Sequence, residues 1–258
     1  MKRLLLLLTA CASLLVSACG TLNSTRLLQG GLLAAQALAI TDDQVRACVH
    51  ESVLRMDEEN PVAAENSELA RRLKRITAGL TDVDGVPLNF KVYQTPQINA
   101  FACADGSVRV FSGLMQVMND DELLSVLGHE IGHVALKHSK RQMQNTLLRN
   151  AALEGLASTD QRVAALTDSQ LAAIGAAILD AKYSKSQETE ADDYGYDFLV
   201  AQGKNPWVMA QAFQKLLLYA NNEAPKGTIG NLFSSHPDTE SRISRVAEKA
   251  AADGFKIP

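Results

Sequence analysis

The sequence predicts an α+β fold: a mostly helical domain with a small sheet of three or four strands beside one long helix. Alternation of apolar and polar residues, typical of half-buried strands, is confined to residues 89–111. Elsewhere the apolar residues recur at helical spacing. The chain has 258 residues, 47% hydrophobic and 21% charged, which suffices for a sizeable core in one large domain or two small ones.

The charge balance argues against one broad class of partner. Lysine and arginine number 25 against 29 acidic residues, and only 5% of the residues are aromatic. Domains that bind nucleic acid carry a basic surface, and many add aromatic side chains on which bases stack. We therefore expect no nucleic-acid partner.

The N-terminus is typical of a cleavable secretory signal. Lys2 and Arg3 precede an uncharged, mostly apolar run from Leu4 to Ala18. This run is too short to span a bilayer and too hydrophobic to begin a soluble fold. The alternative is a buried first helix.

The end of this run, Val16-Ser17-Ala18-Cys19, resembles the lipobox of bacterial lipoproteins. The resemblance implies cleavage after Ala18 and lipid attachment to Cys19, and Gly20 in the next position implies the periplasmic face of the outer membrane. Acyl chains on Cys19 would anchor the protein stably. The alternative is an ordinary signal on a soluble periplasmic protein. We expect a signal peptide at 1–18, a lipid-anchored tether at 19–40 and the main domain at 41–258.

Two of the 4 cysteines remain in the main domain. Cys11 leaves with the signal and Cys19 carries the lipid, so Cys48 and Cys103 are left. In the oxidising periplasm these two could form a disulfide, or they could be independent buried apolar residues. Both alternatives stay open.

Before the strands, three segments have helical character. The Leu- and Ala-rich stretch from Thr21 to Ile40, interrupted by Gly30-Gly31, predicts a weak amphipathic helix. Helical spacing follows from Val45 to Met56 and from Ser67 to Leu80. Asn60-Pro61 separates these two helices.

The strands themselves are short. Residues 89–94 and 107–111 alternate in polarity, and residues 98–102 lie between them. Asp105-Gly106 predicts a hairpin turn between the second and third strands.

After the strands the chain is expected to be helical. Asn119, followed by acidic residues, is typical of an N-cap, and the apolar pattern continues through Leu136. The Ala- and Leu-rich segment from Leu147 to Ala181 comes next. Further helices are expected over residues 184–203, 206–221 and 237–252, with a loop at 222–235.

The most specific motif is His129-Glu130-Ile131-Gly132-His133, within the helix that begins near Asn119. Histidines at i and i+4 share one helical face, so both imidazoles can reach one Zn²⁺ ion. The Glu130 carboxylate beside that ion can take a proton from a metal-activated water molecule. The alternative is two histidines on an exposed helix face. His138 is expected on the surface, near the C-terminal end of this helix.

A catalytic zinc site needs a third protein ligand and an open position. No third histidine follows at metzincin spacing, which favours a carboxylate from Glu188-Thr-Glu190-Ala-Asp192. Glu188 and Asp192 share a helical face, whereas Glu190 lies about 200° around the helix. We expect Glu188 as the ligand and Asp192 as acceptor of the free ring N–H of a zinc-binding histidine. The alternative is a solvated acidic surface.

Taken together, these motifs resemble a known family. His-Glu-Ile-Gly-His followed by Glu-x-x-Ala-Asp, the Asn-Ala-Phe-Ala and Gly-Leu-Met stretches, and a late His-Pro followed by Arg are similar to HtpX-like gluzincins. These are zinc metallopeptidases of the CAAX prenyl protease type, and the similarity runs from Asp42 to the C-terminus. It implies a zincin-type metallopeptidase domain with one Zn²⁺ per chain, held by His129, His133 and Glu188, with Glu130 as the general base.

The resemblance also implies roles that spacing does not reveal. His236 would donate to the oxyanion of the transition state, or would be a fourth zinc ligand that keeps the resting site closed. Arg242 would orient the acidic residues beside the ligands, although a plain surface arginine is the alternative. The edge strand that pairs with an extended substrate would consist of Asn99, Ala100, Phe101 and Ala102. The Gly-rich turn that usually follows this strand is reduced to Cys103-Ala104-Asp105-Gly106.

The implied function is a zinc-dependent endopeptidase that cleaves unfolded or misfolded envelope proteins as part of protein quality control. Its partners would be such substrates, the membrane through the lipid anchor, and proteins of outer-membrane assembly or proteolysis. The segment 147–181 lies in chain order between the two zinc-binding helices and could cover the cleft as a lid. The alternative function is a lipid-anchored, chaperone-like assembly factor of the outer membrane, whose zinc is structural or latent.

Overall fold

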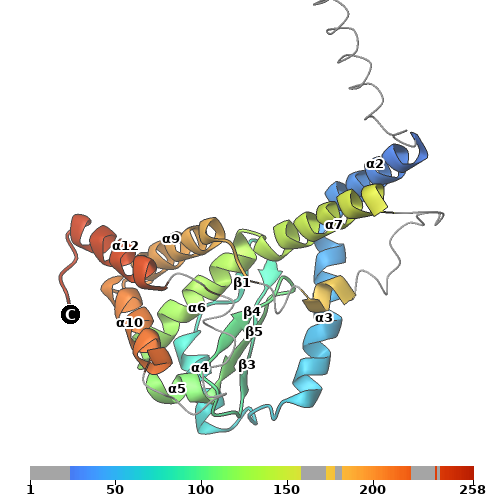
Figure 1. The fold of residues 1–258 in the computed structure, drawn as a ribbon. Helices are drawn as coiled ribbons and strands as arrows, with labels where there is room; N and C mark the ends of the chain where they lie inside the picture. Colours follow the sequence, from blue (N-terminus) through green and yellow to red (C-terminus); the bar gives the residue numbers. More distant parts are fainter. Residues whose placement is uncertain (1–23, 158–172, 178–181, 222–235, 237–238) are drawn as a thin grey trace, which may run out of the picture. The chain divides into compact units, whose positions relative to one another are not determined.

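The computed structural model describes residues 24–157, 173–177, 182–221, 236 and 239–258 (Figure 1). The expected signal peptide, the lipobox and Cys19 lie outside this part, and so does most of the expected lid. None of the helices within these ranges is long and apolar enough to cross a membrane.

The chain divides into two compact units. The first comprises Met1–Ala39 and Gln144–Leu166, and the second comprises Ile40–Met143 and Thr167–Pro258. Within the described ranges, the first unit holds helix α2 (Ser24–Ala39) and the later part of helix α7 (His138–Ala157). The elements of the second unit, besides the start of α7, are α3 (Asp42–Glu59), α4 (Glu68–Ile76), β1 (Asp82–Val83), β2 (Val86–Pro87), β3 (Asn89–Tyr93), β4 (Ala100–Ala102), β5 (Ser107–Phe111), α5 (Ser112–Val117), α6 (Asp120–Ala135), α9 (Lys185–Ala201), α10 (Trp207–Asn221) and α12 (Thr239–Ala252).

The predicted fold class is confirmed: a mostly helical α+β domain surrounds small sheets. The main sheet has the order β3-β5-β4, with β3 parallel to β5 and β4 antiparallel to it. The turn between β4 and β5 falls at Asp105-Gly106, where Gly106 has a φ of 85° that favours glycine. The β1–β2 hairpin was not expected from the sequence pattern.

Strand β4 forms one edge of this sheet in the described part of the chain. The backbone N–H of Phe111 donates to the carbonyl of Asn99, and that of Cys103 donates to the carbonyl of Ser107. In an antiparallel pair, alternate residues direct their backbone groups to the partner strand and the others direct theirs away. Ala100 and Ala102 therefore point their N–H and C=O groups towards the outer edge.

Helix α6 lies between the sheet and α9, with α10 and α12 beyond it (Figure 1). It begins with a capping box, in which the Asn119 side chain accepts from the backbone of Glu122 and the Glu122 side chain accepts from that of Asn119. Every residue from Glu122 to Val134 is buried. A helix buried all round is held rigidly by its neighbours, which suits an element that carries a site.

Glycines let α9 approach α6 closely. A Cβ atom on Gly195 would lie 3.0 Å from the backbone nitrogen of His129, and one on Gly132 would lie 3.2 Å from the carbonyl oxygen of Ala191. Both distances are shorter than ordinary van der Waals contact. Because these two positions carry no side chain, the first two turns of α9 can lie beside the metal-binding motif.

The predicted continuation of α6 to His138 is wrong. The helix ends at Ala135, and Lys137 adopts a left-handed backbone conformation with a φ of 54°. A left-handed residue after a helix turns the chain away from the helix axis. Helix α7 then begins at His138.

Of the two alternatives that the sequence left open for the cysteines, the structure shows no disulfide. Cys48 on α3 and Cys103 after β4 are both buried, but no bond joins their sulfur atoms. Cys48 packs closely against Gly175: a Cβ atom added to that glycine would lie only 2.9 Å from the Cys48 Cβ atom. Burial, with the nearby charge of Asp105, raises the pKa of the Cys103 thiol well above its ordinary value. The two cysteines thus correspond to the other alternative, separate buried side chains.

Candidate active site

Helix α6 directs both motif histidines to one point. The Nε2 atoms of His129 and His133 lie 3.1 Å apart, and both side chains are almost fully buried. Glu130 is also buried, and its Oε1 atom makes no hydrogen bond with any described residue. A buried carboxylate oxygen that accepts no hydrogen bond is costly unless a nearby charge or a bound group compensates it.

Glu188 reaches the same point from the first turn of α9. Its carboxylate oxygens lie 3.6 Å from the Nε2 atoms of His129 and His133. Burial alone would raise the pKa of Glu188, but the hydrogen bond with His236 and the charge of Arg242 hold it below its ordinary value. The carboxylate is therefore ionised at neutral pH, as a metal ligand must be.

His236 completes the cluster from a distant part of the sequence. Its Nδ1 atom lies 3.2 Å from His129 Nε2 and 3.1 Å from Glu188 Oε1. Its Nε2 atom lies 3.4 Å from Glu130 Oε1. Burial would lower the pKa of His236, but the charges of Glu130 and Glu188 raise it.

The donor set fits a zinc ion. His129, His133, Glu188 and His236 each offer a ligand atom, and these atoms all lie within 4.8 Å of one another. Two ligands bound tetrahedrally at 2.0–2.1 Å from one zinc ion lie about 3.3 Å apart. Four of the separations among these atoms are 3.1–3.6 Å and agree with that geometry.

Asp192 and Arg242 support the cluster from behind. Asp192 Oδ1 lies 2.9 Å from His129 Nδ1, the nitrogen turned away from the cluster. Arg242 donates to both Asp192 oxygens, at 2.9 and 2.7 Å, and its Nη1 lies 2.7 Å from Glu188 Oε2. Burial would raise the pKa of Asp192, but the bond to His129 and the charge of Arg242 hold it well below its ordinary value. Arg242 is buried at this site, so it is not the plain surface arginine of the alternative.

His138 is buried, contrary to the expected surface position. The reason is the turn at Lys137, after which the first residue of α7 lies against His133 of α6. His138 Nδ1 lies 2.7 Å from His133 Nδ1, and its Nε2 lies 3.4 Å from Glu190 Oε2. Burial and the charge of Arg141 lower the pKa of His138 to about 4. Glu190 does not lie on the metal-facing side of α9 but contacts His138 and Arg141, as its position around the helix predicts.

Two aromatic side chains at the site were missed in the sequence. The ring of Tyr183 stacks on His133, with centroids 3.8 Å apart. Phe213 lies edge-on to His129 and has the Arg242 guanidinium 4.5 Å above its ring. Neither belongs to a spacing pattern, so no sequence signal pointed to them. Phe213 also lines a pocket beside the cluster, with Val126, Leu216, Thr239, Glu130 and His236 among the other lining residues.

The chain is similar to known proteins over most of its length. The model of Peptidase family M48 matches residues 63–250. The chain is 38% identical over 257 residues to "Metalloprotease LoiP" of Escherichia coli strain K12, covering 99% of this chain and 100% of that protein. It is 35% identical over 253 residues to "Metalloprotease YcaL" of the same strain, covering 97% and 98%.

A longer relative also matches. The chain is 30% identical over 233 residues to a "Putative beta-barrel assembly-enhancing protease" of Vibrio cholerae, covering 85% of this chain and 46% of that protein. The family resemblance expected from the motifs is thereby confirmed. The chain belongs to Peptidase family M48 and is a metalloendopeptidase.

Proposed function

We propose that the protein is a zinc-dependent endopeptidase of the outer membrane that cleaves unfolded or misfolded envelope proteins. The observation that carries the proposal is the convergence of four buried ligand atoms beside the buried Glu130 carboxylate, whose Oε1 atom accepts no hydrogen bond from the described residues. His129, His133 and Glu188 would hold one zinc ion. Zinc bound there supplies Lewis-acid activation of a water molecule and of the scissile carbonyl.

The remaining steps belong to the chain's own side chains. Glu130 takes a proton from the attacking water and returns it to the leaving amine. His236 completes the donor set in the resting enzyme and gives way when a substrate enters. Its ring N–H then donates to the oxyanion, a contact whose loss typically lowers turnover by about 10²–10³-fold.

The edge of the sheet supports the proposed substrate class. The outward N–H and C=O groups of Ala100 and Ala102 can pair with any extended peptide, whatever its sequence. Folded proteins rarely present such a segment, whereas unfolded ones do. The pocket beside Glu130 is walled partly by Val126, Phe213 and Leu216, so we propose that an apolar side chain next to the cleaved bond fits there.

The proposed location depends on the N-terminal motif. The lipobox resemblance at Cys19 supports a lipid anchor, and Gly20 supports the outer membrane. In a cell fractionation, Cys19→Ala should move the protein from the membrane to the soluble periplasmic fraction. An unchanged membrane fraction would refute the anchor and leave the catalytic proposal intact.

A second candidate function is an assembly factor for outer-membrane proteins with a latent site. Its support is the position of His236 inside the donor set and the name of the Vibrio cholerae relative. A digest of reduced, unfolded casein separates the two, run on zinc-loaded protein, on chelated protein and after zinc is restored. Cleavage that disappears with the chelator and returns with zinc is expected. A zinc-loaded protein that leaves casein intact would contradict the peptidase proposal.

A further inference from the structure

His133 has a close partner on the side away from the donor cluster. Its Nδ1 atom lies 2.7 Å from His138 Nδ1, and the His138 side chain is completely buried. The two nitrogens are within hydrogen-bond distance, so one of them carries the proton and the other accepts it. His138 belongs to neither the metal-binding motif nor the donor cluster.

The direction of this bond follows from the position of His133. Its Nε2 faces His129 and Glu188, so a metal would bind there. A neutral imidazole that ligates through Nε2 carries its proton on Nδ1. His133 Nδ1 therefore donates, His138 Nδ1 accepts, and the proton of neutral His138 resides on Nε2.

That second proton points to an acidic side chain. His138 Nε2 lies 3.4 Å from Glu190 Oε2. Glu190 is itself held by Arg141 at 2.7 Å and by the Ser186 hydroxyl at 3.0 Å. A chain of polar groups thus runs from His133 through His138 to Glu190, and each member fixes the proton position of the one before it.

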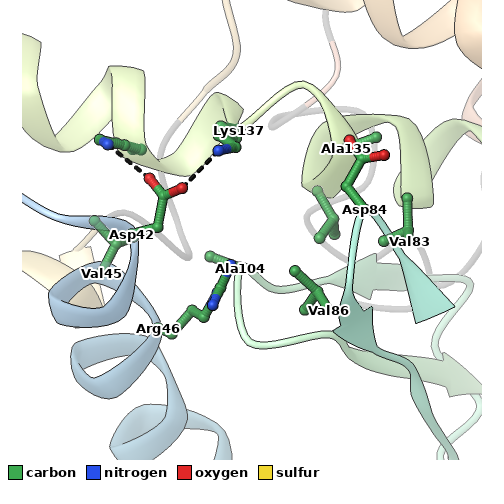
Figure 2. A pocket seen from close by; sticks show the side chains of 11 residues that line it. Asp42, Val45, Arg46, Val83, Asp84, Val86, Ala104, Ala135 and Lys137 are labelled. Atoms are coloured by element: carbon green, nitrogen blue, oxygen red, sulfur yellow. Dashed lines mark hydrogen bonds and ion pairs between the residues drawn. The ribbon is translucent and has the colours of Figure 1, made fainter.

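The turn between α6 and α7 sets His138 in this place. Lys137 has the left-handed conformation that ends α6, and its Nζ pairs with Asp42 Oδ2 at 2.5 Å. Lys140 pairs with the other Asp42 oxygen at 2.6 Å. Figure 2 shows the two ion-pair contacts of the Asp42 carboxylate, at the start of α3, one of them with Lys137.

We propose that His138 is a positioning residue: it holds the tautomer and ring orientation in which His133 binds the metal through Nε2. Asp192 has the same relation to His129, at 2.9 Å, so each motif histidine has its own buried acceptor. The inference rests on the proposed zinc centre. Outer partners of this kind typically contribute about 10–100-fold to metal affinity.

Two amide variants give a sharp test. Asn places its side-chain oxygen near the position of the His Nδ1 atom, whereas Gln reaches the position of Nε2. The zinc dissociation constant is measured by competition with a chromophoric chelator. We expect His138→Gln to bind zinc about 10–100-fold more weakly than wild type, and His138→Asn to recover most of the affinity. Equal affinity in the two variants would overturn the proposal.

His50→Gln is the matched control. His50 is also bonded through Nδ1 to an acid, Asp105 at 2.9 Å, but its side chain is 57% exposed and lies apart from the donor cluster. Its zinc affinity should equal that of wild type. Melting temperatures of the metal-free proteins check that the His138 variants fold.

A measurement on the wild type does not depend on variant folding. With ¹⁵N-labelled histidine and bound zinc, NMR should show a protonated Nδ1 on His133 and scalar coupling through the hydrogen bond to His138 Nδ1. A His133 ring protonated on Nε2 would overturn the proposal. Wild-type protein that binds no zinc would instead refute the proposed function, so the two failures are distinguishable.

Discussion

Glu188 and His236 lie 3.1 Å apart although 48 positions separate them in the chain. The same His236 nitrogen lies 3.2 Å from His129 Nε2. One side chain thus fills a position among the donors that a substrate or a water molecule would need. Under the proposed function, His236 would close the resting site and would exchange these contacts for others when a substrate enters.

The first prediction concerns this closure. His236→Ala should bind a peptide hydroxamate about tenfold more tightly than wild type, because no side chain competes for the open position. Zinc should remain at one ion per chain, since three protein ligands suffice. Isothermal titration of the zinc-loaded variant checks both expectations. An unchanged hydroxamate affinity would show that His236 does not block the site.

Asp192 provides a second prediction. Asp192→Asn should weaken zinc binding by about 10–100-fold, because His129 loses the anionic acceptor that orients it. The metal-free protein should also melt at a lower temperature, since Arg242 would be left with less charge compensation. Asp193→Asn is the control, as Asp193 pairs with Arg245 on the more exposed side of α9. Equal zinc affinity in both variants would contradict the role of Asp192.

The sequence could predict the positions of those site residues that local helix geometry determines. Helical spacing put His129 with His133, and Glu188 with Asp192, on common faces, because helix geometry is local. His138 was misplaced, because its position depends on the left-handed turn at Lys137, and no spacing rule signals that turn.

Other parts of the site depend on contacts between distant segments. Tyr183 and Phe213 reach the histidines only after α9 and α10 pack on α6, so periodicity could not select them. The relation of Cys48 to Cys103 likewise depends on tertiary packing, and the sequence left it open. His236 was identified only through the family resemblance, since a lone histidine before a proline has no local signature.

A third prediction concerns stability away from the site. Asp57 on α3 accepts from Arg109 at 2.7 and 2.9 Å, from Lys91 at 2.7 Å and from the Tyr93 hydroxyl at 2.7 Å. Burial would raise the pKa of Asp57, but these bonds hold it well below its ordinary value. Asp57→Asn should lower the free energy of unfolding at pH 7 by about 2–4 kcal/mol.

The pH dependence of this effect has a definite sign. Because the folded-state pKa of Asp57 is depressed, its contribution is complete above the unfolded value of about 3.9 and is lost as the pH falls towards the folded value. Urea unfolding at pH 7 and pH 3 should therefore show a smaller difference between wild type and Asp57→Asn at pH 3. Asp43→Asn, on an exposed side chain of α3, should change little. An Asp57→Asn deficit that is equal at both pH values would contradict the ionised network.

The fourth prediction addresses the outer edge of β4. Ala102→Pro removes one outward N–H without breaking the ladder to β5, since proline is tolerated on edge strands. One lost hydrogen bond should lower kcat/KM for an unfolded protein by about 3–10-fold, mainly through KM. Ala102→Ser keeps the N–H and should cleave like wild type. If the proline variant matches wild type while binding zinc normally, the substrate does not pair with this edge.

The central claim is that Glu130 acts as the general base beside a bound zinc ion. Its most direct test is Glu130→Gln, with Glu248→Gln on the exposed face of α12 as the matched control. Zinc content by mass spectrometry and cleavage of unfolded casein are measured on the same preparations. We expect one zinc per chain in both variants, with cleavage lost in Glu130→Gln and unchanged in Glu248→Gln. Full cleavage by zinc-loaded Glu130→Gln would contradict the account.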